Sequence, residues 1–144
     1  MTSVGATSSF GVTSSHTGSR PETGRPSART IVRLRGALDV TAVPALRERL
    51  IGLLHPGASL LVLDLSRVPS CDSAGLAVLI GTQRRARLLG IVMRLAAPSL
   101  PVAKLLRLTG LDHNLTIFPD LRSALAVERH DPAKASPSPR VLAG

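Results

Sequence analysis

Residues 60–76 read LLVLDLSRVPSCDSAGL, and this stretch decides the fold. Residues 60–65 are apolar almost without interruption, which is typical of a central strand covered on both faces. The helical pattern that follows begins at about Ser73 and runs to Leu89, where Gly90 ends it. A buried strand that passes through a short turn into a helix is a basic unit of α/β folds.

Strands and helices alternate on both sides of this unit. Residues 30–35 alternate apolar and basic side chains as a half-buried strand does, and residues 41–54 carry apolar residues at helical spacing. Further strands are expected at 91–95 and 115–118, and further helices between Pro98 and Gly110 and from Asp120 to about Glu128. The pattern predicts an α/β domain with a mixed, mostly parallel sheet of about four to five strands, with about four helices and right-handed crossovers.

The two ends of the chain differ in composition from this central part. Residues 1–28 are rich in Ser, Thr and Gly and are expected to form a flexible arm, with residues 8–13 as a candidate edge strand. Prolines recur in residues 130–144, so a disordered tail is expected there. The folded domain is therefore predicted at residues 29–129.

Composition argues against several classes of function. One Cys cannot form an internal disulfide, and no apolar run approaches the roughly 20 residues that span a bilayer. No signal peptide is recognised, so a cytoplasmic protein without membrane binding is expected. Two Phe and no Tyr or Trp leave no stacking platform for single-stranded nucleic acid. The net charge of +9 comes from scattered arginines, so direct nucleic-acid binding is not expected.

Ser73 is the residue to which the chemistry of the central turn points. In an open α/β sheet, the loops after the carboxyl ends of the strands gather at one edge and form the usual functional surface. A helix N-terminus presents unpaired N–H groups and a partial positive charge, so a phosphate on Ser73 would be tolerated. It would add about −1.5 to −2 charges to a surface that a partner must desolvate, so it would act on binding.

One side of the helix that begins at Ser73 is bare. Steps of four residues lead to Ala77 and Gly81, which are small, and then to Arg84 and Arg85. Exposed helix positions more often carry long polar side chains. We interpret the bare side as a surface that another protein approaches closely, with an incidental run of small residues as the alternative.

Three short segments strengthen this interpretation by their order and spacing: residues 36–39 (GALD), 72–76 (DSAGL) and 105–112 (LLRLTGLD). Together they resemble the landmarks of the STAS domain, the fold of bacterial anti-sigma factor antagonists. The resemblance covers roughly residues 30–127. It implies a protein that binds an anti-sigma factor, frees a sigma factor and so regulates sigma-factor-dependent transcription.

The resemblance also implies a switch at Ser73. In the family, the Ser directly after the Asp of DSxGL is phosphorylated by an anti-sigma factor that is itself a kinase; the unphosphorylated form binds and the phosphorylated form is released. The implied partners are an anti-sigma factor of the GHKL Ser/Thr kinase type and a PP2C-type phosphatase, and the protein is expected to be a monomer or weak dimer. The implied binding surface consists of Asp39, Thr41, Asp72, Ser73, Ala74, Gly75, Ala77, Gly81 and Arg84.

Three details of the landmarks need attention. Ala74 stands where many relatives have a second Ser, which removes an alternative phosphate acceptor. Asp39 belongs to the recognition edge in relatives, but it is equally interpretable as a helix-capping carboxylate near Thr41, itself a predicted N-cap. The strand that relatives place before the GALD segment is poorly defined in this sequence. The sequence therefore does not determine which strand forms this edge of the sheet.

Two other interpretations compete with the switch. A STAS scaffold that binds a partner without being phosphorylated fits the same residues. An enzyme would use Ser73 or Cys71 as nucleophile with a His as base, but no Gly-x-Ser-x-Gly elbow surrounds Ser73. No cluster with metal-ligand spacing and no Gly-rich cofactor loop occurs in the sequence, so no catalysis, metal or cofactor is expected.

Overall fold

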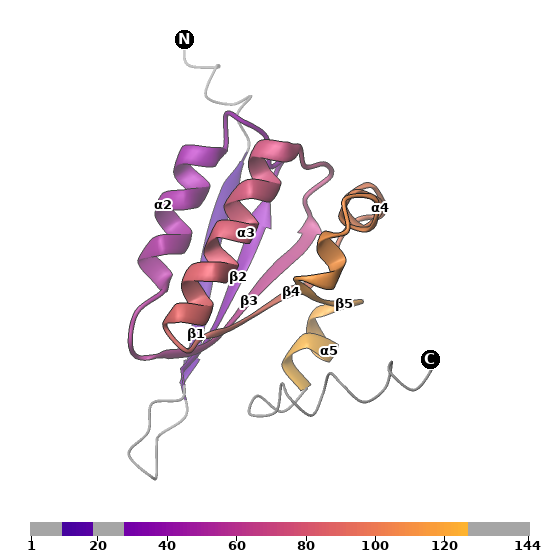
Figure 1. The fold of residues 1–144 in the computed structure, drawn as a ribbon. Helices are drawn as coiled ribbons and strands as arrows, with labels where there is room; N and C mark the ends of the chain where they lie inside the picture. The colour runs from indigo at the N-terminus through magenta and orange to yellow at the C-terminus, as the bar shows by residue number, and fades with distance from the viewer. Residues whose placement is uncertain (1–9, 19–27, 127–144) are drawn as a thin grey trace.

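Five strands form one sheet in the computed structural model, which describes residues 10–18 and 28–126 (Figure 1). The strands are β1 (Gly11–Gly18), β2 (Ala28–Arg35), β3 (Ala58–Arg67), β4 (Val92–Ala96) and β5 (Thr116–Phe118), in the spatial order β1-β2-β3-β4-β5. The helices are α2 (Val43–Leu53), α3 (Ser73–Leu88), α4 (Leu100–Leu108) and α5 (Leu121–Ala126), with a 3-10 helix η1 (Leu111–His113). Only the pair of β1 with β2 is antiparallel, so the prediction of a mixed, mostly parallel α/β sheet is confirmed.

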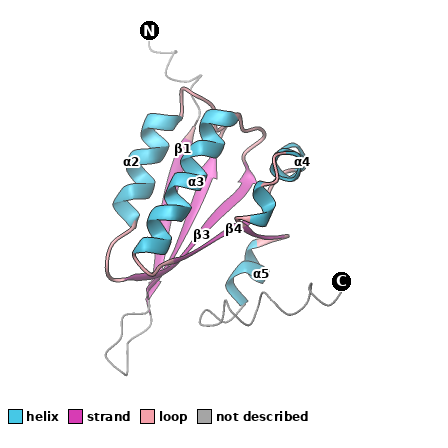
Figure 2. Ribbon diagram, in the orientation of Figure 1, coloured by secondary structure: helices cyan, strands magenta, loops and turns pink. Residues whose placement is uncertain are grey.

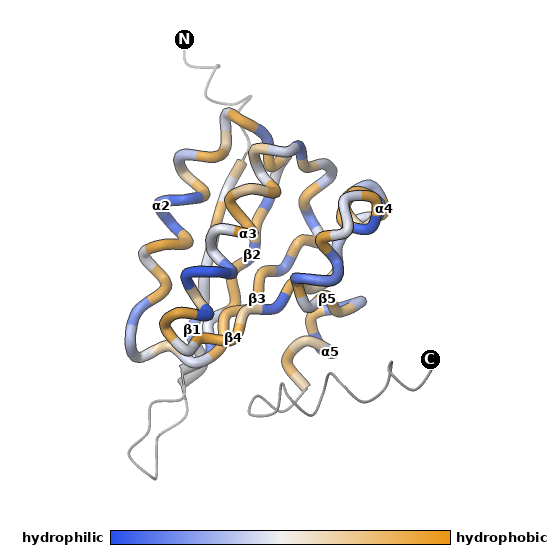
Figure 3. The backbone as a smooth tube through the Cα atoms, in the orientation of Figure 1, coloured by the Kyte–Doolittle hydropathy of each residue, from blue (hydrophilic) through white to orange (hydrophobic). Residues whose placement is uncertain are grey.

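The sheet is covered on both faces. Helices α2 and α3 lie side by side over one face, where the main apolar core forms (Figure 2). Both helices alternate between hydrophobic and hydrophilic segments, as helices with one side in the core do (Figure 3). On the other face, α5 packs against Leu60, Val62 and Ala96. Because successive strand residues point to opposite faces, this double cover explains why residues 60–65 are buried throughout.

Strand β1 occupies residues that the sequence assigned to a flexible arm. It pairs with β2 from Gly11 opposite Arg35 to Gly18 opposite Ala28, further along the chain than the edge strand considered at 8–13. Val12 packs against the main core, and most of the remaining residues are Ser, Thr or Gly, so the apolar pattern indicates a strand near Val12 but does not give its bounds. Residues 1–9, 19–27 and 127–144 lie outside the described residues, and the tail at 130–144 stays a prediction.

The expected helices are present with small differences at their ends. Asp120 caps α5, since its Oδ1 accepts a hydrogen bond from the backbone N–H of Ser123 at 2.7 Å. In α4, Val102 and Leu106 are buried, whereas Leu108 is 73% exposed because it lies on the opposite side of the helix. Within the described residues, no helix combines the length and apolar character needed to cross a bilayer.

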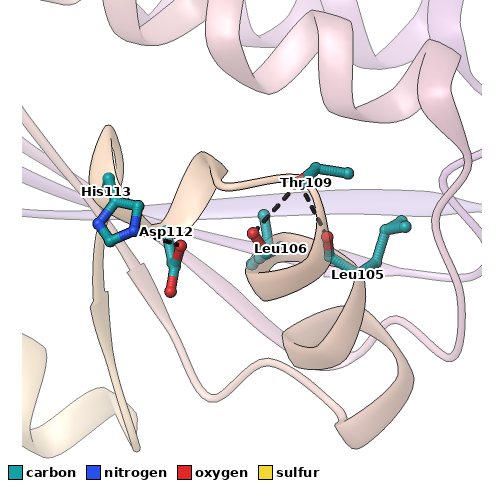
Figure 4. Close-up of polar contacts among 5 residues, drawn as sticks. All are labelled: Leu105, Leu106, Thr109, Asp112 and His113. Atoms are coloured by element: carbon teal, nitrogen blue, oxygen red, sulfur yellow. Dashed lines mark hydrogen bonds and ion pairs between the residues drawn. The ribbon is translucent and has the colours of Figure 1, made fainter.

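The LLRLTGLD segment is a helix-ending motif. The Thr109 hydroxyl donates to the carbonyl oxygens of Leu105 and Leu106 at 2.8 and 3.1 Å, which satisfies the last turn of α4 (Figure 4). Gly110 follows with φ 77°, the left-handed conformation that favours glycine at a helix C-terminus. The Asp112 carboxylate then lies 3.8 Å from the exposed His113 ring. This landmark therefore closes the C-terminal end of α4.

Candidate functional site

Two loops meet at the carboxyl end of β2 and β3. The Leu38 N–H donates to the Ser70 carbonyl oxygen at 2.9 Å, and the Asp72 N–H donates to the Leu38 carbonyl oxygen at 3.1 Å. Leu38 also forms a parallel bridge with Cys71 and is fully buried. These contacts join the GALD and DSAGL segments into a single surface, which we call the switch edge: residues 36–41 and 70–77.

Asp72 is the N-cap of α3. Its Oδ1 accepts hydrogen bonds from the backbone N–H groups of Ala74 and Gly75 at 2.9 and 3.1 Å. This capping role was missed from the sequence, although an Asp directly before a helical pattern is a common N-cap signal. The cap makes Ser73 the first residue of the helix, and Ser73 is exposed there.

Asp39 caps the turn that leads into α2. Its Oδ1 accepts hydrogen bonds from the Thr41 hydroxyl at 2.7 Å and from the N–H groups of Thr41 and Ala42 at 3.1 and 3.2 Å. These bonds, that of the Thr41 hydroxyl above all, hold the pKa of Asp39 below its usual value. Asp39 therefore acts as a capping carboxylate for the turn before α2, and its place on the recognition edge stays a prediction; the prediction that Thr41 is the N-cap is wrong. Thr41 donates its hydroxyl to Asp39, and α2 begins at Val43 after Ala42.

Gly75 marks the closest approach of α3 to the loop after β2. A Cβ at this position would overlap the Leu38 carbonyl oxygen and would lie 2.9 Å from Leu38 Cβ and 3.0 Å from Cys71 Sγ. Gly75 is buried, so its expected place on the binding surface needs correction. The residue acts by packing, because it lets the helix and the loop hold the switch edge together.

The bare side of α3 borders a groove of about 450 Å³ between α2 and α3. Its lining includes Arg47 and Ile51 from α2 and Ala77, Gly81, Arg84 and Leu88 from α3. Ala77, Gly81 and Arg84 are all exposed, and a Cβ built at Gly81 meets no atom within 4 Å. The structure therefore places these three predicted residues on one open surface, which we call the α2–α3 groove and which begins at Ala77, one helical turn after Ser73.

The Cys71 thiol is held in its neutral form. Burial raises the pKa of this thiol to about 11, and the nearby negative charge of Asp72 acts in the same direction. A thiolate is the nucleophilic form of Cys, so a raised pKa makes Cys71 a poor nucleophile.

Alkylation tests this assignment. We expect iodoacetamide at pH 8 to modify Cys71 at least about tenfold more slowly in the folded protein than in urea. Mass spectrometry against time gives both rates, and the unfolded chain is its own control. Equal rates in the two states would show that the folded thiol is as accessible and as readily ionised as the thiol of the unfolded chain.

Comparisons with known proteins agree with this geometry. A model of the STAS domain family matches residues 20–124. The anti-sigma-B factor antagonist of Bacillus subtilis is 36% identical over 80 residues, which cover 56% of this chain and 72% of that protein. An anti-sigma factor antagonist from Mycobacterium paratuberculosis has a TM-score of 0.59 at 24% identity, over 78% of this chain and 92% of that chain. The Bacillus cell fate determinant SpoIIAA in its phosphorylated form has a TM-score of 0.54 at 20% identity, over 77% and 96%. Both structures support the fold alone.

Proposed function

Because this chain belongs to the STAS domain family of anti-sigma factor antagonists, we propose that phosphorylation of Ser73 switches its binding to an anti-sigma factor. The unphosphorylated protein binds the anti-sigma factor, and the phosphorylated protein is released. The proposed partner is a Ser/Thr kinase of the GHKL type, and a PP2C-type phosphatase reverses the modification. The observation that carries the proposal is the exposed hydroxyl of Ser73 at the start of α3, one helical turn before Ala77, which lines the α2–α3 groove.

Electrostatics explains why a phosphate at this position would act on the partner. Asp72 already accepts hydrogen bonds from the backbone N–H groups of Ala74 and Gly75. The start of α3 therefore has fewer free N–H donors for a phosphate. Arg84 lies about 16 Å further along the helix, beyond the Debye length of about 8 Å at physiological salt. The added charge of about −1.5 to −2 would therefore remain uncompensated within the switch edge and would oppose a docked protein.

The shape of the α2–α3 groove suits close contact with a protein. Its lining includes the exposed cations Arg47 and Arg84 and the exposed small residues Ala77 and Gly81. Small side chains let another backbone approach, and arginines are enriched in protein interfaces. The groove and Ser73 together define a contact surface on which a phosphate lies at one end.

Filling the groove tests the proposed surface. Gly81→Arg is expected to weaken binding of the anti-sigma factor at least about tenfold, or about 1.4 kcal/mol, because the new side chain occupies the groove. The fold should be unaffected, since the added Cβ meets no atom within 4 Å. Titration of the partner gives the affinity, and a thermal melt gives the stability.

Gly52→Arg is the matched control. Gly52 is also an exposed helical glycine whose Cβ would meet no atom within 4 Å, and the groove lining does not include it. It should bind like the wild-type protein. Equal binding by the Gly81 variant and the wild-type protein would remove the groove from the interface.

A further inference from the structure

A second pocket, of about 270 Å³, lies where β1, β2 and β3 meet at the carboxyl ends of β2 and β3. Its lining includes Thr13 of β1, Arg33 and Arg35 of β2, and Asp64, Ser66 and Arg67 of β3. The two β2 arginines alternate with Val32 and Leu34, which belong to the core beneath α2 and α3. The pocket therefore opens on the opposite face of the sheet from the α2–α3 groove.

The pocket has an excess of positive charge. Arg33 forms an ion pair with Asp64, with 3.8 Å between Nε and Oδ2, and the other Asp64 oxygen accepts the Ser66 N–H at 3.0 Å. Across residues 10–18 and 28–126, neither Arg35 nor Arg67 has a carboxylate within 4.0 Å. One carboxylate thus faces three guanidinium groups, and the pocket carries two uncompensated positive charges.

The strand register brings these charges together. Arg33 pairs with Asp64, so a regular parallel ladder would place Ser66 opposite Arg35; a register shift places Arg67 there instead. Like charges on directly opposed residues destabilise a sheet. Arg35 also lies against β1 at Gly11, where an added Cβ would be 2.8 Å from Arg35 Nη2. Because both side chains also line the pocket, an anion bound in it would offset part of their positive charge.

Other arginines on the same face of the sheet are used by the fold. Arg94 donates from Nη1 to the Ala124 carbonyl oxygen at 2.7 Å, and Arg29 donates from Nη2 to the Leu125 carbonyl oxygen at 3.4 Å. Both satisfy carbonyls at the end of α5, where positive charge is favourable. Within residues 10–18 and 28–126, neither Arg35 nor Arg67 makes such a hydrogen bond to α5. Support of α5 therefore does not account for them.

We propose that this pocket binds a phosphate-class oxyanion, as inorganic phosphate or as the phosphate group of a small ester. Guanidinium groups of Arg35 and Arg67 match two oxygens of a phosphate, and the hydroxyls of Ser66 and Thr13 supply further donors. The volume lies just below the usual range of about 300–1,000 Å³ for small-molecule sites, which suits a small ligand. The proposal does not rest on the Ser73 switch, because none of the residues that line the pocket belongs to the switch edge.

Thermal melts and calorimetry of the full chain test this site. At matched ionic strength, millimolar inorganic phosphate is expected to raise the Tm of the wild-type protein by several degrees relative to chloride. Glycerol phosphate is the second ligand: a larger shift than with inorganic phosphate assigns the site to an ester, and an equal shift assigns it to the phosphate group alone. Isothermal titration of the wild-type protein with each ligand gives the affinity directly.

The double variant Arg35→Gln, Arg67→Gln should lose the phosphate-dependent shift. In chloride its Tm should equal or exceed that of the wild-type protein, because the opposed charges are gone. Arg49→Gln with Arg107→Gln is the matched control, since both residues are exposed and neither lines the pocket. No shift with either ligand in the wild-type protein, or the same shift in the Arg35/Arg67 variant, would overturn the proposal.

Discussion

Gly75→Ala is expected to lower the free energy of unfolding by about 3 kcal/mol and the Tm by at least about 10 °C. The added methyl group would overlap the Leu38 carbonyl oxygen, and Leu38 is fully buried and fixed by hydrogen bonds to Ser70 and Asp72. Leu38 cannot move away from α3 without breaking these hydrogen bonds. Urea unfolding monitored by circular dichroism measures the change.

Gly81→Ala is the control for this substitution. It adds the same methyl group to the same helix, but at a position with no atom within 4 Å of the new Cβ. Replacing a helical Gly by Ala usually stabilises a helix by about 0.5–1 kcal/mol, so this variant should be slightly more stable than the wild-type protein. A similar effect of the two substitutions would mean that the loop after β2 does not press on α3 at Gly75.

Ser73→Asp is expected to weaken binding of the anti-sigma factor at least about tenfold. Ser73→Ala should bind the anti-sigma factor constitutively, because it cannot be phosphorylated at this position. Ser73 is exposed, so neither change removes a core contact. An acidic residue at the first position of α3 is favourable for the helix, and the Tm should stay within a few degrees of the wild-type value. Titration of the partner at two salt concentrations measures the effect, which should shrink as salt screens the charge.

The control for this charge is Thr116→Asp. Thr116 is an exposed hydroxyl residue on β5, the edge strand at the other side of the sheet from β1, so the variant adds the same charge away from the switch edge. It should bind like the wild-type protein. If both Asp variants lose affinity equally, net charge and not the position of Ser73 governs binding.

Much of the fold could be predicted because β3 and α3 have strong and different patterns. Residues 60–65 have an apolar side chain at nearly every position, and only a doubly covered strand buries all of them. Arg33 and Arg35 alternate with buried residues and identify β2 as half-buried. Ser73, Ala77 and Gly81 follow from helical spacing alone, and the structure has all three exposed on one helix.

The remaining features depend on contacts that one sequence does not encode locally. Asp39 and Thr41 are both good capping residues, and the choice between them depends on the turn that lets Asp39 accept three hydrogen bonds. The sequence around Gly75 does not reveal that a Cβ at this position would overlap the Leu38 carbonyl oxygen, so the sequence pattern predicts Gly75 on the binding surface. The pairing of Arg35 with Arg67 depends on a register shift between strands, which side-chain patterns do not reveal.

The most direct test of the central claim is to locate the phosphate after incubation with the anti-sigma factor and ATP. Trypsin should release residues 68–84, in which Ser70, Ser73 and Thr82 carry hydroxyls; Thr82 is buried and bonded to the Val78 carbonyl oxygen. We predict a single phosphate on Ser73, detected by mass spectrometry, and loss of the complex once it is added. Three results after incubation with ATP would contradict the account: a complex that persists with no phosphate added, a phosphate on another residue, or a phosphorylated protein that still binds.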